Sequence, residues 1–216
     1  MAEPADNEPE TYQIMRAIEE SIIADEDVDL EKYIDFWRHV CRVMSSWGLI
    51  FNFVVADVTA KVEKLAEKLQ NSPETYRTIV SMATGENDNG TIRNRKPNRS
   101  GMGHLMVLNR ALEFVIDMLN GVFTAENPKA RVSAIARVSY DKHLAFQHAW
   151  IIRKGVNTAL HSLPYKDEFL IRLRGDAPET DDVQFHNVFQ RDGKDIVRRV
   201  NRLVELFNLT DYNPSA

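Results

Sequence analysis

The chain has 216 residues, of which 44% are hydrophobic, with only 9 glycines and 8 prolines. This length and apolar content are sufficient to bury a hydrophobic core. The longest apolar run, residues 47–56, is interrupted by Asn52 and is too short for a membrane span of about 20 residues. The acidic N-terminus lacks the features of a signal peptide, and the single Cys41 can form no internal disulfide, so a cytoplasmic location is expected.

The formal net charge of -5 is unevenly distributed. Residues 1–31 hold eleven carboxylates and one arginine, a sum of -10, so the remaining residues carry +5. The densest basic segment, residues 91–100, contains Arg93, Arg95, Lys96 and Arg99 and no acid. Such a segment can attract an anionic membrane surface or can be a solvated loop. Because no aromatic residue is interleaved with these cations, we do not expect nucleic-acid binding.

Hydrophobic periodicity predicts helices along nearly the whole chain, in one domain over residues 11–216 that follows a disordered acidic segment at 1–10. The predicted helices cover residues 11–24, a segment capped by Asp29, residues 45–69, 73–84, 104–121, a segment starting at 127–128, residues 140–163 and residues 182–207. Gly48 is expected to bend the chain, Ser72 to cap the helix that begins at Pro73, and Gly121 to end its helix. No strand is predicted, so the fold class is all-α.

One helical stripe changes character along its length. Steps of three and four residues from Ile50 pass through Phe53 and Val54 and then reach Asp57, Lys61 and Lys64. Asp57 and Lys61 can be an ordinary solvated i,i+4 pair, worth about 0.2–0.5 kcal/mol. Alternatively, the stripe matches a ligand with an apolar end and a polar head.

Motifs typical of enzymes are missing from the sequence. We find no nucleophile elbow, no glycine-rich phosphate loop and no HExxH pair, and His143 and His148 are five residues apart, so they do not share a helical face. We therefore predict no catalytic residues, no metal site and no cofactor. His148 lies in an apolar run beside Trp150, where a hydrogen-bonded core histidine is the more common case.

Three segments, residues 51–65, 108–119 and 140–170, resemble in order and spacing the signature regions of the glycolipid transfer protein superfamily. The resemblance spans about residues 33–209. It implies a two-layer sandwich of about eight helices that encloses a lipid-chain pocket. It also implies a monomer that carries a sphingolipid between membranes without chemical change, through peripheral and transient membrane contact.

The resemblance assigns roles to individual residues. Asp57 matches an aspartate that accepts a hydrogen bond from the ceramide amide N–H, and His148 matches a histidine that donates to the amide carbonyl. Trp150 resembles a tryptophan that touches the membrane, although core packing would also suit it. The positions that match or adjoin the lining of the chain pocket are Phe51, Val54, Phe114, Leu144, Val156 and Leu160.

The head-group positions depart from the pattern of the superfamily. Val107 stands where glycolipid-binding members carry a sugar-stacking tryptophan, and Gly103 and Val107 stand where phosphate-binding members carry two arginines. Lys61 nevertheless resembles the phosphate-binding branch, and Lys64 lies one turn away. Arg110 also matches a family arginine, but it can instead pair with an acidic neighbour on its helix.

The cations favour an anionic head group, so the predicted cargo is ceramide-1-phosphate or a related phosphosphingolipid. Arg99 can contribute only if its loop folds over the site. The alternatives are transfer of a glycosphingolipid, or a sphingolipid sensor or interaction module without transfer activity.

Overall fold

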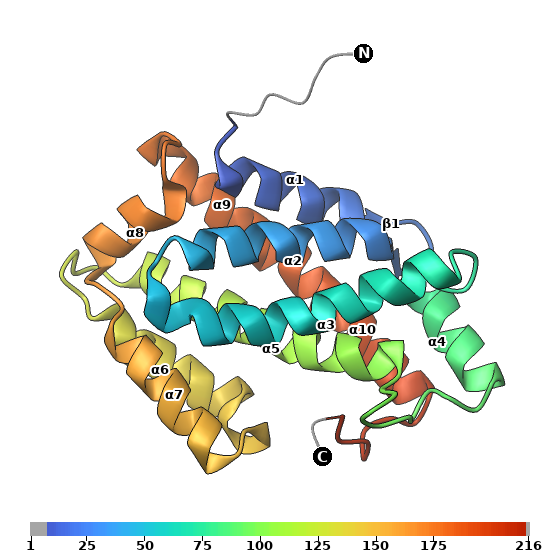
Figure 1. Ribbon diagram of the computed structural model, residues 1–216. Coiled ribbons are helices and arrows are strands. Elements are labelled where there is room, and N and C mark those ends of the chain that lie inside the picture. Colours follow the sequence, from blue (N-terminus) through green and yellow to red (C-terminus); the bar gives the residue numbers. More distant parts are fainter. Residues whose placement is uncertain (1–7, 215–216) are drawn as a thin grey trace.

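The computed structural model describes residues 8–214, so most of the segment predicted to be disordered lies outside the described residues. All regular secondary structure of the described residues is helical except for one short hairpin, which confirms the all-α fold class (Figure 1). The α-helices are α1 (Glu10–Ser21), α2 (Leu30–Ser45), α3 (Asn52–Asn71), α4 (Ile79–Asp88), α5 (Gly101–Thr124), α6 (Val132–His143), α7 (Trp150–His161), α8 (Lys166–Arg174), α9 (Asp182–Val188) and α10 (Lys194–Leu206). The short elements are β1 (Ile22–Ile23), β2 (Asp27–Val28), the 3-10 turns η1 (Leu49–Phe51), η2 (Ala145–Gln147) and η3 (Glu179–Asp181), and the π-helical turn η4 (Phe189–Gly193).

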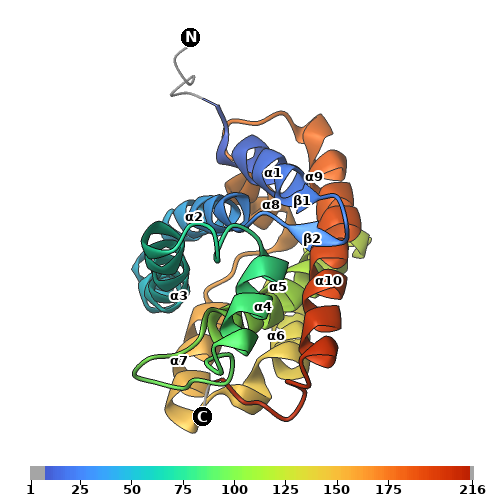
Figure 2. The same ribbon diagram turned by 90° about the vertical axis from the view of Figure 1, so that its right-hand side faces the viewer.

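The helices pack in two layers. In one layer α1 lies on α2 and α2 on α3, and in the other α5 lies on α6 and α6 on α7. α3 contacts α5, and α10 packs against the other side of α5, so that α3 and α10 lie on opposite sides of the molecule in Figure 2. An aromatic contact joins α2 to the C-terminal segment, where the ring centroids of Phe36 and Phe189 are 6.0 Å apart.

Two of the predicted local signals act as expected. The Asp29 carboxylate accepts a hydrogen bond from the amide of Lys32 at 3.0 Å and so caps α2. Gly48 has a φ of 112°, a conformation that glycine adopts without a steric penalty, and it separates α2 from η1 and α3. This turn reverses the chain, so that α3 packs back along α2.

Three other predicted boundaries were wrong, one of them the helix start at residues 127–128, since α6 begins at Val132. α4 begins at Ile79 rather than at Pro73, because Thr78 and Ser81 form a reciprocal capping box while residues 72–78 form turns. α5 continues past Gly121 to Thr124. A Cβ at Gly121 would lie 2.5 Å from Cγ2 of Ile135, so this glycine permits the close approach of α6 rather than ending α5.

The predicted continuous helix over residues 140–163 is divided. α6 ends at His143, η2 follows, and His148 and Ala149 are extended before α7 begins at Trp150. Residues 144–149, where the helix is divided, contain no glycine or proline that would signal a break. Tertiary contacts hold it instead, because the Arg153 Nε donates to the His148 carbonyl at 2.8 Å and Arg110 donates to the side chain of Gln147 at 2.7 Å.

The sequence also failed to predict the β1–β2 hairpin. Ile22 pairs with Val28 and Ile23 with Asp27, across a turn in which Asp25 and Glu26 have positive φ. The hairpin depends on α10, since the Arg199 guanidinium donates to the carbonyl of Ile23 at 2.8 Å. Within residues 8–214, no helix is both long and apolar enough to cross a bilayer.

Candidate functional site

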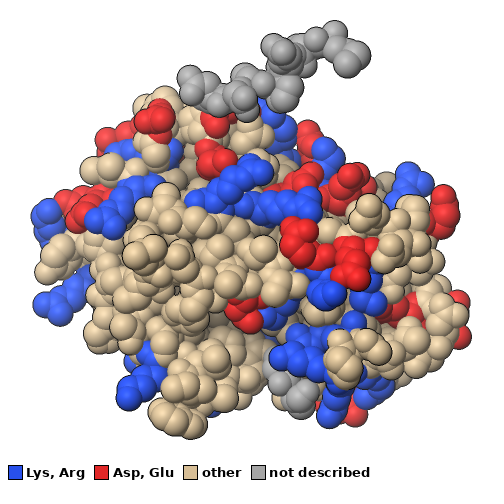
Figure 3. Space-filling view, in the orientation of Figure 1, with Lys and Arg blue, Asp and Glu red and all other residues tan. Residues whose placement is uncertain are grey.

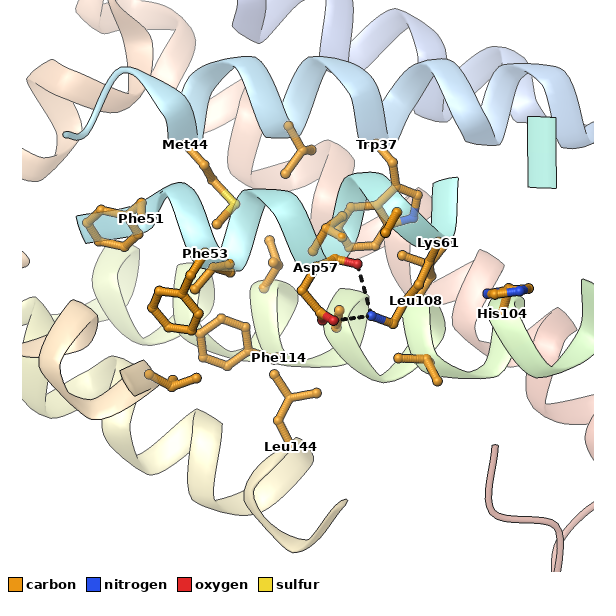
Figure 4. Close-up of a pocket in the computed structure, with 18 of the residues that line it drawn as sticks. Trp37, Met44, Phe51, Phe53, Asp57, Lys61, His104, Leu108, Phe114 and Leu144 are labelled. Atoms are coloured by element: carbon orange, nitrogen blue, oxygen red, sulfur yellow. Dashed lines mark hydrogen bonds and ion pairs between the residues drawn. The ribbon is translucent and has the colours of Figure 1, made fainter. Parts of the chain in front are cut away.

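A cavity of about 1620 Å³ lies between the two helical layers. Its walls come from α2, α3, α5, the turn after α6, and α7. The six residues predicted for the chain pocket all line it: Phe51, Val54, Phe114, Leu144, Val156 and Leu160. Figure 4 shows Phe51, Phe53 and Phe114 gathered at one end and Asp57, Lys61 and His104 toward the other. The separation of apolar and polar residues along α3 is thus repeated in the cavity as a whole.

Lys61 and Asp57 form an ion pair at the polar end (Figure 4). The Lys61 Nζ lies 2.6 Å from the Asp57 Oδ1 and donates to the Asp57 carbonyl at 2.9 Å. Only 12% of the Lys61 side chain is exposed, compared with 66% of Asp57. Burial lowers the pKa of Lys61, and the Asp57 carboxylate opposes this shift. The pair is therefore not an ordinary solvated pair, since its cation is inside the cavity wall and its carboxylate remains open to a ligand.

His148 lies in the cavity wall at the break between α6 and α7. Its Nδ1 is 2.9 Å from the Tyr140 hydroxyl. When that hydroxyl donates to Nδ1, the neutral ring carries its proton on Nε2 and can donate it to a ligand carbonyl. Burial lowers the pKa of His148, which favours this neutral form, and the Asp57 carboxylate opposes the shift. Asp57 and His148 thus offer one acceptor and one donor to the same cavity.

Further cations line the polar end. Lys64 lies in the wall and pairs with Glu67 at 2.6 Å, and Lys68 follows one turn later on α3. Lys96 and Arg99, from the loop between α4 and α5, also line the cavity. His104 on α5 faces them, and burial together with the neighbouring cations lowers its pKa to about 4. The polar end is therefore suited to an anionic group.

Arg110, predicted for the head group, and Trp150, predicted for membrane contact, both lie outside the cavity. The Arg110 guanidinium donates to Gln147 at 2.7 Å and lies over the ring of Phe146, and it is not among the residues that line the cavity. It does not pair with the acids of α5 as the alternative proposed. Trp150 is 72% exposed at the start of α7, outside the cavity and outside the core.

Some lining residues were not predicted from the sequence. Lys68 continues the stripe of Asp57, Lys61 and Lys64 by one more turn, so extending the same spacing would have found it. No sequence signal marked His104. Among residues 8–214, no group of three or more His, Cys, Asp or Glu side chains could hold a metal ion.

Comparison with known proteins agrees with this architecture. The family described as glycolipid transfer protein (GLTP) matches residues 28–175, more than half of the chain. The chain belongs to this family. It is 33% identical over 160 residues to a ceramide-1-phosphate transfer protein of Homo sapiens, covering 71% of this chain and 73% of that one. It is 36% identical over 151 residues to the corresponding protein of Bos taurus, covering 67% and 69%.

The solved structures extend the likeness to nearly the whole fold. The crystal structure of human ceramide-1-phosphate transfer protein in complex with 12:0 ceramide-1-phosphate matches with a TM-score of 0.81 at 27% identity, covering 92% of this chain and 97% of that one. The apo form of the mouse protein matches with a TM-score of 0.80 at 26% identity, covering 95% and 100%. The two-layer helical sandwich of this chain is therefore that of the glycolipid transfer protein family.

Proposed function

We propose that the protein transfers a sphingolipid between membranes, with ceramide-1-phosphate as the preferred cargo. The observation that carries this proposal is the cavity of about 1620 Å³, which is apolar at one end and lined by a carboxylate, an imidazole and ammonium groups at the other. A ceramide has the matching chemistry, since it combines hydrocarbon chains with one amide donor and one amide acceptor. Most of the named relatives are ceramide-1-phosphate transfer proteins, which supports the same cargo.

Recognition of the ceramide rests on Asp57 and His148. The Asp57 carboxylate accepts the amide N–H, and the Nε2 proton of His148 is donated to the amide carbonyl. An amide that enters the cavity without these partners would lose about 1–3 kcal/mol per unpaired group. The chains enter between α3, α5 and α7, where each buried methylene is about 0.8 kcal/mol more stable than in water, so the chains avoid exposure to solvent during transfer. Neither contribution requires a covalent step, so the protein acts as a carrier and not as an enzyme.

Transfer between vesicles tests the amide contact. We expect Asp57→Val and His148→Leu each to reduce transfer of fluorescent ceramide-1-phosphate at least tenfold while the protein remains folded by circular dichroism. Asp141→Val and His161→Leu are the matched controls, because both residues are exposed and lie outside the cavity. Folded Asp57 and His148 variants with full transfer activity would overturn the proposed roles.

Membrane contact is proposed for an exposed apolar surface near the cavity, here called the apolar rim and made of Leu49, Phe146, Trp150, Ile151 and Ile152. Leu49 is 87% exposed and Trp150 72% exposed. α7 contacts η1, so the two elements that carry Trp150 and Leu49 are adjacent. Figure 3 shows a broad area without charged side chains over this part of the molecule. Monomers of soluble proteins seldom expose such patches without a function, and tryptophan is suited to the membrane interface.

Vesicle sedimentation tests this surface. We expect Trp150→Ala to weaken binding to vesicles that contain phosphatidic acid, whereas Leu206→Ala, at an exposed position on α10, should not. Equal binding by the two variants would contradict the assignment. The contact we propose is peripheral, and the free, buried Cys41 fits the predicted cytoplasmic location.

Transfer of a simple glycosphingolipid is the second candidate. It is supported by a match to a glycolipid transfer protein of Xenopus laevis, 28% identical over 155 residues and covering 69% of this chain and 73% of that one. The cations at the polar end favour the phosphate. An interaction module without cargo has less support, because such a module has no need for an open cavity of this volume.

A further inference from the structure

Hydrogen bonds hold the loop between α4 and α5 at the polar end of the cavity. Tyr212, near the C-terminus, donates its hydroxyl to the Asn94 carbonyl at 2.8 Å. The Ser100 hydroxyl donates to the Ile92 carbonyl at 2.7 Å and accepts from the amide of Gly103 at 2.9 Å. The first bond joins the two ends of the loop, and the second caps the N-terminus of α5. These bonds hold the intervening residues, of which Lys96, Pro97, Asn98 and Arg99 line the cavity.

Arg99 is buried in this wall without a counter-ion. It is 5% exposed, and no carboxylate of residues 8–214 lies within ion-pair distance of its guanidinium. The buried Nε of Arg99 has no hydrogen-bond partner among residues 8–214. Burying an unpaired charge is costly, so a native protein that does so usually has a ligand or a partner for it. The cavity is the space from which such a ligand can reach Arg99.

Gly103 makes room for the arginine. A Cβ at this position would lie 2.8 Å from Cγ of Arg99 and 2.8 Å from the Tyr212 hydroxyl oxygen. Any larger residue would displace the Arg99 side chain or break the contact that fastens the loop. The position of the Arg99 side chain therefore depends on Gly103. Because this residue of α5 has no side chain, Arg99 from the preceding turn can pack directly against the helix.

The charges around Arg99 are not balanced. In the cavity wall, Lys61 is paired with Asp57, Lys64 with Glu67, and Lys68 lies 3.6 Å from Glu86. Lys96 and Arg99 line the same space, and no ion pair joins either to an acid of residues 8–214. A phosphomonoester carries about -1.5 to -2 charges near neutral pH and offers three acceptor oxygens. A guanidinium can bind two of these oxygens with parallel hydrogen bonds, which a neutral sugar cannot match.

We propose that Arg99, assisted by Lys96, binds the phosphate of the sphingolipid head group and selects a phosphorylated ceramide over a glycosylated one. This inference rests on the proposed function and names the residue that decides which lipid head group the protein accepts. The ligand is the lipid phosphate rather than free inorganic phosphate, because the same cavity continues into the apolar chain pocket.

The experiment compares transfer of three fluorescent lipids with the same acyl chain: ceramide-1-phosphate, glucosylceramide and unmodified ceramide. We expect Arg99→Gln to reduce transfer of ceramide-1-phosphate about 10- to 100-fold, as befits the loss of charge-assisted hydrogen bonds. Transfer of the other two lipids should change less than about twofold. Lys96→Gln, at an exposed position that does not disturb packing, should give a smaller loss confined to the same lipid. Arg95→Gln is the control from the same loop, since Arg95 is exposed and does not line the cavity.

The other possible results would contradict either this inference or the proposed function. An unchanged ratio of ceramide-1-phosphate to glucosylceramide in Arg99→Gln and Lys96→Gln, with wild-type activity present, overturns this inference alone. Equal loss for all three lipids assigns Arg99 a structural role and also overturns it. Inorganic phosphate that blocks transfer of all three lipids would make free phosphate the ligand. A wild-type protein that transfers none of the lipids overturns the proposed function as well.

Discussion

His104 provides a test of the polar end that needs no ligand. It lies on α5 in the cavity wall, and its Nδ1 is buried without a hydrogen-bond partner among the described residues. Burial lowers its pKa to about 4, and Arg99 from the loop and Lys68, Lys61 and Lys64 from α3 add to the shift. The folded protein thus keeps this imidazole neutral under conditions in which the unfolded chain protonates it.

The sign of the effect on stability follows from this shift. Because the pKa is lower in the folded state than in the unfolded state, the unfolded state binds more protons as the pH falls. The contribution of His104 to stability is fully present above about pH 6.5 and is lost progressively as the pH falls toward 4. Between pH 7 and pH 5, a shift of this size amounts to about 2 kcal/mol, and partial screening by solvent reduces it to about 1–2 kcal/mol.

Urea unfolding at pH 7 and pH 5 measures this difference. We expect His104→Gln to lose about 1–2 kcal/mol less stability than the wild type over this interval, since glutamine has no proton to gain. His161→Gln, at an exposed position on α7, should lose as much as the wild type does. If His104→Gln and the wild type lose the same free energy of unfolding, the imidazole is not held neutral by its surroundings and the electrostatic picture of the polar end is refuted.

Three further predictions concern the stability of the helices around the cavity and the dependence of lipid binding on acyl-chain length. Glu86 is buried and accepts hydrogen bonds from the amide of Gly101 at 2.5 Å and the Tyr76 hydroxyl at 2.8 Å, so Glu86→Ala should cost about 2–4 kcal/mol in urea unfolding; an unchanged midpoint would exclude this role. Gly121→Val should cost about 1–3 kcal/mol, visible as a lower Tm, because its side chain would overlap Ile135, whereas a wild-type Tm would show that α6 can move away. For short-chain lipids that bind as monomers from water, removing one methylene from the acyl chain should weaken binding about fourfold, and affinity independent of chain length would place the chain outside the cavity.

The sequence was sufficient for the fold class and for several of the residues that line the cavity. Apolar residues at helical spacing specify which face of a helix is buried, and this local property survives any arrangement of the helices. The six residues that the family resemblance assigned to the chain pocket are all apolar, and all of them line the cavity. Asp57 and Lys61 could likewise be placed together, because residues four apart on one helix are always neighbours.

Only the tertiary structure decided which residues surround the polar end of the cavity. The bend at His148 has no glycine or proline to announce it, and hydrogen bonds from Tyr140 and Arg153 hold it in place. Arg99 enters the cavity because a distant tyrosine fastens its loop and a glycine on α5 leaves it room. Arg110, which family resemblance placed at the head group, is held by Gln147 instead. Helical periodicity determines which residues share a face of one helix. Whether charges from a loop meet those of a helix depends instead on how the whole chain packs.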